Sequence, residues 1–239
     1  MGVCMDYNSA KKIFKNIKED LTQEQYLMFE QYKKLLLEYN EHTNLTAIVE
    51  EQDIWIKHFA DSCLLLKYIK PDSSLIDVGT GAGFPGIPVK IMNPSVNVSL
   101  IDSLNKRVIF LEDVVKSLNL GNIKCYHGRA ESFANLKNYR EQFDVVTARA
   151  VANISTLSEY CLPFVKVGGI FICMKGSNYE EELKQGEKAI KVLGGKIENI
   201  DEFELPIIKD KRAIIIIRKI SDTPSMYPRK EGVPSKNPL

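Results

Sequence analysis

LIDVGTGAGFPGIP, which runs from Leu75 to Pro88, is the most informative stretch of this sequence. Its first four residues are mostly apolar, as in buried parallel strands, and a helical segment begins shortly after Pro85. Glycine tolerates positive φ angles and has no Cβ atom, so a glycine-rich turn lets the backbone press against a ligand. The order of strand, glycine-rich turn and helix therefore predicts a ligand site at the carboxyl end of the first strand of a doubly wound sheet.

The sequence after this turn alternates between strands and helices. Four further apolar runs are expected to be parallel strands, at Val96–Ile101, Ile123–Tyr126, Asp144–Ala148 and Ile170–Met174. Helical segments are expected around them, at Ile87–Met92, Lys106–Leu118, Ile154–Leu162 and Glu180–Val192. Two last runs, Ile197–Leu205 and Arg212–Arg218, have no convincing helix between them and are expected to pair as a hairpin. The predicted fold class is α/β, a Rossmann-like and mostly parallel sheet with a C-terminal antiparallel hairpin.

The first 70 residues read as a helical extension packed on this sheet. Thr22 and Gln25 form the pattern of a capping box at the start of a helix. An apolar stripe follows at helical spacing, made of Phe29, Tyr32, Leu36 and Tyr39. A second helical segment is expected from Ile54 to Tyr68. We therefore expect three parts, namely residues 1–70 as the helical extension, 71–220 as the main domain and 221–239 as a basic, proline-rich tail.

Composition limits the class of protein. The chain has 239 residues, of which 44% are hydrophobic and 26% charged, so it can bury a substantial core. No apolar run approaches the roughly 18 residues of a membrane span, and the N-terminus lacks the apolar segment of a secretory signal. Five cysteines without CxxC spacing and three histidines give little support to a zinc site. We expect a cytoplasmic protein that binds neither a metal nor a membrane.

The C-terminal segment carries a local excess of positive charge on a chain whose net charge is only +1. From Lys209 to Leu239, eight Lys and Arg residues accompany three Asp and Glu residues. Such a patch can hold RNA phosphates, and the alternative is a solvated tail without a partner. Four prolines after residue 223 predict that the end of the chain is extended.

Asp77 bears on which ligand the glycine-rich turn binds. The spacing Gly81-x-Gly83-x-x-Gly86 also satisfies the dinucleotide pattern, so the glycines alone do not choose the cofactor. Asp77 ends the first strand, where its carboxylate attracts the ammonium and sulfonium groups of S-adenosylmethionine. A pyrophosphate at the same place would be repelled. Asp77 therefore favours S-adenosylmethionine.

Asp102 ends the second strand and indicates an adenosine. A carboxylate at this point can accept both ribose hydroxyls, whichever cofactor carries the nucleoside. The alternative is that Asp102 caps the N-terminus of the following helix. After the third strand, Ala130 and Glu131 would lie beside the adenine ring and offer hydrogen bonds to its edge.

Leu75 to Pro88 resembles the signature of the glucose-inhibited division protein B family, the ribosomal small-subunit methyltransferase G group. Further motifs of that family occur in order, namely Asn44-Leu45-Thr46, His58-Phe59-Ala60-Asp61-Ser62, Asp102-Ser103, Lys106-Arg107, Arg149-Ala150, Met174-Lys175-Gly176 and Tyr227-Pro228-Arg229-Lys230. The resemblance implies a class I methyltransferase that transfers a methyl group from S-adenosylmethionine to N7 of one guanine in 16S ribosomal RNA. It also implies a cofactor site with Gly79, Phe84, Ala130, Glu131 and Arg149, beside the Asp77, Gly81 and Asp102 argued above.

Chemistry at guanine N7 needs few catalytic groups. N7 carries an exposed lone pair and no proton, so it can attack a sulfonium methyl group without a general base, and the rate depends on alignment. Arg149, Lys175 and His58 are the candidate catalytic residues, expected to hold O6, phosphates or the cofactor carboxylate. For His58, a hydrogen-bonded structural histidine is the alternative.

Two other functions are compatible with parts of the sequence. An NAD-dependent oxidoreductase would use the same glycines and Asp102, but a recognisable pair of proton donors is lacking. A non-catalytic RNA-binding or ribosome-assembly factor would keep the cofactor motif on a methyltransferase fold. The expected partner is 16S ribosomal RNA or the small ribosomal subunit, and no obligate protein partner is evident.

Overall fold

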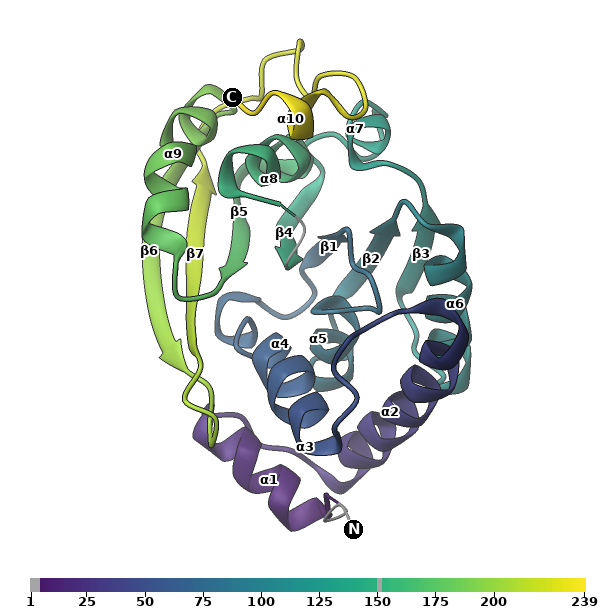
Figure 1. The fold of residues 1–239 in the computed structure, drawn as a ribbon. Coiled ribbons are helices and arrows are strands. Elements are labelled where there is room, and N and C mark those ends of the chain that lie inside the picture. Colours follow the sequence, from purple (N-terminus) through teal and green to yellow (C-terminus); the bar gives the residue numbers. More distant parts are fainter. Residues whose placement is uncertain (1–4, 150–151) are drawn as a thin grey trace.

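A seven-stranded sheet forms the centre of the protein, as seen in a computed structural model that describes residues 5–149 and 152–239 (Figure 1). The strand order is β3-β2-β1-β4-β5-β7-β6. The strands are β1 (Ser74–Val78), β2 (Asn97–Asp102), β3 (Ile123–His127), β4 (Phe143–Arg149), β5 (Val165–Lys175), β6 (Gly195–Glu204) and β7 (Lys211–Lys219). The first five are parallel, and β7 pairs antiparallel with both β5 and β6. The predicted Rossmann-like sheet with a terminal hairpin is confirmed.

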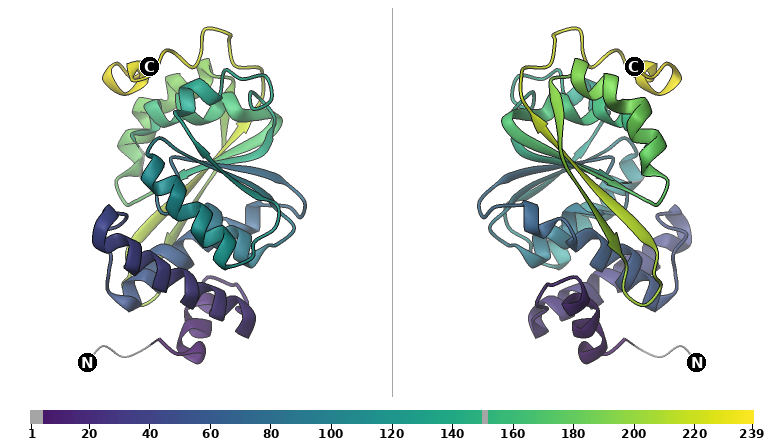
Figure 2. Two further views of the ribbon diagram at one scale, coloured as in Figure 1. Left: turned by 90° about the vertical axis from the view of Figure 1, so that its right-hand side faces the viewer. Right: turned by 90° about the vertical axis from the view of Figure 1, so that its left-hand side faces the viewer.

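Helices cover both faces of this sheet (Figure 2). One face carries α1 (Tyr7–Asn16), α2 (Gln23–Thr43), α3 (Glu51–Asp53), α4 (Asp61–Cys63), α5 (Gly86–Met92) and α6 (Asn105–Ser117). The other carries α7 (Ala130–Phe133), α8 (Ile154–Cys161), α9 (Tyr179–Val192) and α10 (Val233–Lys236). Successive strand residues point to opposite faces, so Leu75 lies in the first core and Ile76 in the second. Both faces are buried, which explains why the strands read as continuous apolar runs.

The segment expected to be one helix from Ile54 to Tyr68 contains several kinds of helical turn. A π-helical stretch spans Ile54–Ala60, α4 follows it, and a 3-10 turn covers Leu66–Tyr68. π-helical turns are wider than α-helical ones, are rare, and often occur at functional sites. His58 lies in the π-helical stretch and Asp61 directly after it.

The N-terminal helices support the glycine-rich turn directly. The predicted capping box of Thr22 and Gln25 is present at the start of α2. Farther along α2, the buried Tyr32 hydroxyl donates a hydrogen bond to the carbonyl of Ala82. The Gln25 side chain also donates to the backbone carbonyls at the end of α5, at 3.4 Å. The helical extension thus contacts the glycine-rich turn. The boundary between the extension and the main domain stays a prediction.

The expectation of an extended C-terminal tail is wrong. Residues 233–236 form α10, and the tail lies across α8 rather than projecting from the domain (Figure 1). Arg140 donates hydrogen bonds to the carbonyls of Thr223 and Tyr227, at 2.7 and 2.8 Å, and Pro228 and Pro234 are buried. The prolines restrict the backbone of the tail, but its carbonyls accept hydrogen bonds from the folded domain and two of its proline rings are buried.

The positive charge of this segment is largely paired with distant carboxylates. Five of the eight basic residues form ion pairs, namely Lys209, Arg212, Arg218, Lys219 and Arg229. Their partners include Glu141, Glu159 and Glu198, which lie 20 or more residues before the basic residue that each of them pairs with. Counting charges along the sequence therefore overestimates the patch that is available for RNA. Within the described residues, no helix is both long and apolar enough to cross a membrane.

Candidate active site

Two cavities lie along the carboxyl edge of the sheet. The first, of about 100 Å³, is lined by the ends of β1 and β2, the loop after β3 and Tyr160 of α8. The second, of about 340 Å³, is lined by residues at the ends of β4 and β5, the start of β7 and the helical segment around His58. β1 and β4 are neighbours at the point where the strand order reverses, which is where open α/β sheets bind their ligands.

The two cavities separate the predicted site residues into two groups. The first cavity brings together Gly79, Asp102, Ala130 and Glu131. The second brings together His58, Arg149 and Lys175. Of the motifs named above, Ala150 lies outside the described residues.

Asp77 braces the glycine-rich turn and keeps one oxygen without a partner. It is fully buried, and its Oδ2 accepts hydrogen bonds from Thr80 Oγ1 at 2.6 Å and from the Gly86 amide at 2.8 Å. Its Oδ1 is buried and has no hydrogen-bond donor. Burial raises the pKa of Asp77 to about 6, despite the opposing effect of those hydrogen bonds and of Arg149. A buried carboxylate oxygen without a donor is costly, and a cationic ligand would satisfy it.

The glycines of the turn have different roles. Gly81 has a φ of +63°, and a Cβ atom added there would have no heavy atom within 4 Å. A Cβ atom on Gly83 would lie 2.5 Å from Ile87 Cδ1, and one on Gly86 would lie 2.4 Å from Leu100 Cδ2. Gly83 and Gly86 are therefore needed for internal packing, whereas Gly81 borders open space on the side where a ligand can approach.

Asp102 is buried and connects the turn to the end of β2. Its Oδ2 accepts a hydrogen bond from the Gly81 amide, and its Oδ1 accepts one from the Leu104 amide, both at 2.9 Å. The helix after it begins at Asn105 and has no side-chain cap, so the alternative role of Asp102 as a helix N-cap is wrong. Arg107 Nη1 also donates to Oδ2, at 3.4 Å, whereas Oδ1 retains a second lone pair that can accept a ribose hydroxyl.

Phe84 lies outside the wall of the first cavity. Its ring is almost completely buried and stacks on the His58 ring, with centroids 4.3 Å apart and planes 14° apart. The Arg149 guanidinium carbon lies 5.0 Å from the centre of the same ring. Phe84 thus supports two residues of the second cavity, and its predicted contact with the cofactor stays a prediction.

Arg149 is held at the end of β4 by three directional hydrogen bonds. Its Nη1 donates to the Lys57 carbonyl and to Asp61 Oδ2, both at 2.9 Å. Its Nη2 donates to His58 Nδ1 at 3.2 Å. All three acceptors lie on one short helical segment, so a planar, forked cation fits this place and a lysine would not.

The hydrogen bonds of His58 fix its tautomer and keep it neutral. Because Arg149 can only donate, His58 Nδ1 must be the acceptor, and Nε2 carries the proton that it donates to Thr46 Oγ1 at 2.8 Å. Burial, with a smaller effect from the charge of Arg149, lowers the pKa of His58 to about 3. Both ring nitrogens are engaged, which argues against a role as general base.

Two residues of the second cavity, Asp61 and Arg212, had no predicted role. Asp61 is buried, and its second oxygen lies 3.2 Å from Nε of Arg212, forming an ion pair without a hydrogen bond. It thus joins arginines from β4 and β7. Asp61 follows His58 by three residues, and helical residues three apart share a face, so this spacing could have indicated that Asp61 belongs to the site. No sequence pattern indicates Arg212, because only the antiparallel return of β7 brings it to this edge.

Lys175 has two partners within the protein. Its ammonium donates to the Ala152 carbonyl and to Glu182 Oε2, both at 2.6 Å. Its side chain is mostly buried between these groups. Lys175 therefore connects β5 to the segment before α8 and to α9, and it contributes positive charge to the cavity wall.

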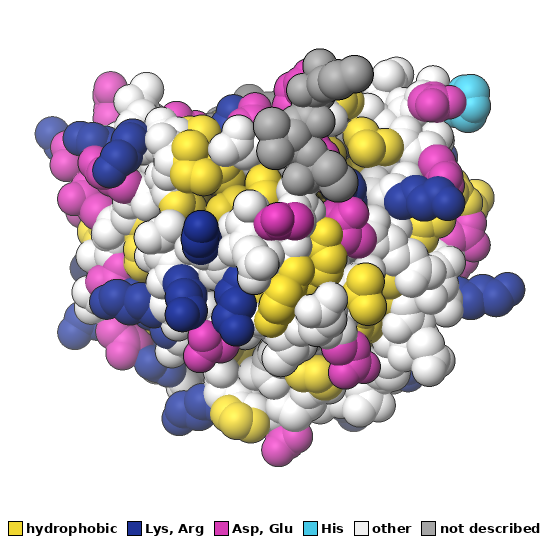
Figure 3. All heavy atoms as spheres, turned by 90° about the horizontal axis from the view of Figure 1, so that it is seen from below, with side chains coloured by type: hydrophobic (Ala, Val, Ile, Leu, Met, Phe, Trp, Pro, Cys, Tyr) yellow, Lys and Arg dark blue, Asp and Glu magenta, His cyan; other side chains and the backbone are white. Residues whose placement is uncertain are grey.

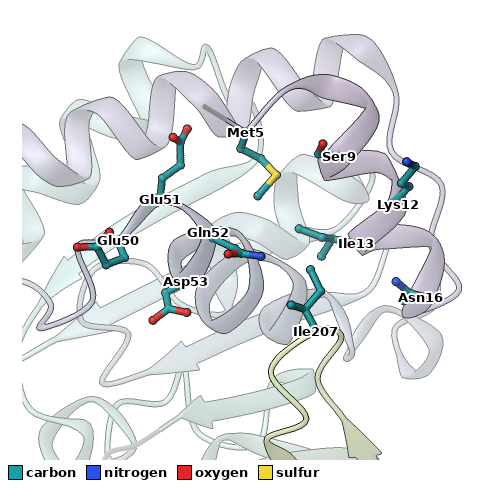
Figure 4. Close-up of a pocket in the computed structure, with 10 residues that line it drawn as sticks. All are labelled: Met5, Ser9, Lys12, Ile13, Asn16, Glu50, Glu51, Gln52, Asp53 and Ile207. Carbon is teal, nitrogen blue, oxygen red and sulfur yellow. The ribbon is translucent and has the colours of Figure 1, made fainter. Parts of the chain in front are cut away.

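A cavity larger than either of these lies elsewhere in the described structure. It measures about 850 Å³ and lies between α1, residues 50–53 and Ile207 in the turn between β6 and β7 (Figure 4). No predicted site residue lines it. Size alone therefore does not identify the active site.

The face of the molecule that is seen from below in Figure 1 carries both basic and acidic side chains (Figure 3).

In the part of the chain that the structure describes, neither the cysteines nor any group of metal-binding side chains forms a second reactive centre. Cys63, Cys125, Cys161 and Cys173 are free thiols, and Cys4 lies outside the described residues. Burial raises the pKa of the Cys173 thiol to about 12. No group of three or more His, Cys, Asp or Glu residues described here is placed to hold a metal ion.

Comparison with solved structures shows the fold. A putative transferase from Pyrococcus horikoshii aligns with a TM-score of 0.55 at 15% identity, over 68% of this chain and 63% of its own. TYW2 from the same organism, solved in complex with MeSAdo, aligns with a TM-score of 0.54 at 16% identity, over 66% of this chain and 61% of its own. At these identities the likeness concerns the fold alone.

Comparison of sequences shows the family. The model of the family described as rRNA small subunit methyltransferase G matches residues 25–214. The ribosomal RNA small subunit methyltransferase G of Desulforamulus reducens is 51% identical over 233 residues, or 97% of each chain. The protein of that name from Clostridium tetani is 52% identical over 216 residues, or 90% of each chain. The chain therefore belongs to the rRNA small subunit methyltransferase G family.

Proposed function

We propose that this protein transfers a methyl group from S-adenosylmethionine to N7 of one guanine in 16S ribosomal RNA. The observation that carries the proposal is the pair of cavities that flank the glycine-rich turn at the carboxyl edge. One has the residues of a nucleoside site, and the other has a volume typical of small-ligand sites and is lined by four basic side chains. The family of the chain supports the same reaction.

The residues around the turn fit S-adenosylmethionine. The unpartnered Oδ1 of Asp77 can accept a hydrogen bond from the ammonium group of the cofactor, and Asp102 can accept the ribose hydroxyls. The adenine would lie between Ala130, Glu131 and Tyr160. The first cavity alone is smaller than a typical ligand site, so the rest of the cofactor would occupy the open space beside Gly81. When bound, the cofactor supplies an electrophilic methyl group on its sulfonium.

The second cavity can hold a guanine without a general base. Arg149 uses three of its five donors within the protein and can offer another to guanine O6. Methylation makes the base cationic, and the Asp61 carboxylate between Arg149 and Arg212 offsets part of the positive charge around it. The residues then act by orienting N7 toward the methyl group.

The first test of this proposal is the choice of cofactor and the transfer itself. The purified protein is expected to bind S-adenosylmethionine and S-adenosylhomocysteine in calorimetry and to show no heat of binding with NAD. With radiolabelled methyl donor it should transfer label to 16S ribosomal RNA or to small subunits. Binding of NAD in preference would support an oxidoreductase. Binding of the methyl donor without transfer to either RNA substrate would support the non-catalytic RNA-binding factor.

The raised pKa of Asp77 predicts a pH dependence of cofactor affinity. Protonation of the carboxyl as the pH falls through about 6 removes the charge that attracts the ammonium group, so S-adenosylhomocysteine should bind more weakly below that pH. The expected slope approaches tenfold per pH unit. Calorimetry from pH 5 to pH 7 measures it.

Methylthioadenosine, which has the nucleoside but no ammonium, serves as the ligand control and should bind with nearly constant affinity over this range. Asp77→Asn should bind S-adenosylhomocysteine weakly and without the slope. Parallel pH profiles for the two ligands on the unmodified protein would place the ammonium away from Asp77.

A further inference from the structure

The C-terminal segment is clamped onto α8 by one buried carboxylate. Glu159 is fully buried, and both of its oxygens face Arg229. The Arg229 side chain donates from Nε at 2.9 and 3.1 Å and from Nη2 at 2.6 Å, and its backbone amide donates to the same carboxylate at 2.8 Å. Four donations from one residue to one carboxylate fix both the side chain and the path of the tail.

Just beyond the clamp, the tail reaches the wall of the first cavity. The Gly232 amide donates to Glu131 Oε1 at 3.0 Å, and the Ser132 hydroxyl donates to Glu231. Glu131 is only 3% exposed and lines the cavity beside Ala130 and Tyr160. Its carboxylate is thus oriented by a residue that lies 101 positions later in the chain.

Other contacts fix the rest of the tail on the same helix. Thr156 of α8 donates from its hydroxyl to the Pro234 carbonyl at 3.1 Å, and Ser155 donates to the Leu239 carbonyl at 2.8 Å. Tyr160, which faces the cavity, is the residue next to Glu159. The tail, α8 and Glu131 therefore form one connected wall around the nucleoside cavity.

We propose that Arg229 and Glu159 are positioning residues for the cofactor, because their clamp holds the Gly232 amide against Glu131 and so fixes the shape of the nucleoside cavity. The inference rests on the proposed use of S-adenosylmethionine. It separates Arg229 from the basic patch expected to hold RNA phosphates, since Nε and Nη2 of its guanidinium already donate to Glu159. Removing the clamp loosens the backbone between the Arg140 and Thr156 contacts, so the Gly232 amide is held less tightly against Glu131. A buried carboxylate that loses its donor turns toward water.

The test compares Arg229→Ala and Arg229→Lys with Lys236→Ala in the full-length chain. Lys236 is an exposed cation of the same tail, so its removal changes the net charge equally. Arg229→Ala is expected to weaken S-adenosylhomocysteine binding on the order of tenfold or more in calorimetry. Arg229→Lys should recover part of the affinity, because an ammonium can make one of the lost contacts. Lys236→Ala should bind the ligand as the unmodified chain does.

Two further measurements separate positioning from stability and from RNA binding. Thermal unfolding of each ligand-free variant gives the temperature at which the least stable variant begins to unfold. Affinities are compared below that temperature, where every variant is folded. RNA affinity is measured without the cofactor and should fall no more for Arg229→Ala than for Lys236→Ala. If Arg229→Ala fails to fold, Glu159→Gln replaces it, since the amide keeps the size of the carboxyl and should also weaken the ligand.

The outcomes distinguish this inference from the proposed function. Unchanged ligand affinity in folded Arg229→Ala or Glu159→Gln, with lost RNA affinity, would overturn the proposed positioning role. It would indicate that Arg229 contacts RNA instead. Tighter ligand binding would also overturn it, because the tail would then close the cavity. If the unmodified chain itself bound no S-adenosylhomocysteine, the proposed function would fall and this inference with it.

Discussion

Replacing Arg149 with alanine is expected to reduce single-turnover methyl transfer at least about 100-fold at saturating cofactor and RNA, the cost of a small misalignment of reacting groups. Arg149 joins β4 to the Lys57 carbonyl, Asp61 and His58. Its loss leaves a cavity at the proposed guanine site and removes one of the two arginines beside the buried Asp61 carboxylate. Single-turnover rates, measured on protein shown to be folded, report the effect on the chemical step.

Arg149→Lys should restore only a small part of the rate, because an ammonium cannot make three hydrogen bonds in the plane of the guanidinium. Arg218→Ala is the matched control. Arg218 is also an ion-paired arginine at a strand end, but its partner is Glu198 of β6. It lies beside Ile170 near the start of β5, at the opposite edge of the sheet. Full activity of Arg149→Ala, or equal losses of activity in the two alanine variants, would contradict the assignment of Arg149 to the active site.

Gly81→Val is expected to abolish binding of S-adenosylmethionine while the protein stays folded. The space beside Gly81 is empty of protein atoms, so the valine side chain would fill the volume assigned to the cofactor. A positive φ at a non-glycine residue costs about 1–3 kcal/mol, which is less than the total stability of most domains. Calorimetry with S-adenosylhomocysteine measures the loss of binding, and circular dichroism verifies the fold.

Gly168→Val controls for backbone strain in that experiment. Gly168 also has a positive φ, of +86°, and open space around its Cβ position, but it lies near the start of β5, away from the cavities. This variant should bind the cofactor normally. Gly83 is not a suitable site for the same test, because a side chain there would collide with Ile87 and Tyr32. Normal affinity in Gly81→Val would show that the cofactor lies elsewhere.

The sheet and its site edge could be predicted because their signals are local. Each strand is an apolar run of the right length, and parallel strands bring residues such as Gly79, Asp102 and Arg149 to one edge whatever the details of packing. The grouping of Asp102 with Gly79, and of Arg149 with Lys175, follows from which strands they end.

The contacts that determine individual roles could not be predicted, because they join residues far apart in the chain. No local pattern shows that Arg229 pairs with Glu159, or that the Gly232 amide binds Glu131. The tail therefore reads as a free basic segment in the sequence and is a docked one in the structure. The same holds for Arg212, which reaches Asp61 only because β7 returns antiparallel to β5.

The central claim is methyl transfer to guanine N7, and product mapping tests it most directly. Small subunits and 16S ribosomal RNA from cells that lack this protein are incubated with the purified chain and methyl-labelled S-adenosylmethionine. Borohydride reduction and aniline cleavage, which break the chain at N7-methylguanine, then locate the modified base. The predicted result is a single cleavage site in 16S ribosomal RNA that coincides with the label and is absent with Arg149→Ala. Label on an exocyclic amine or a ribose hydroxyl, with no aniline-sensitive site, would contradict the account.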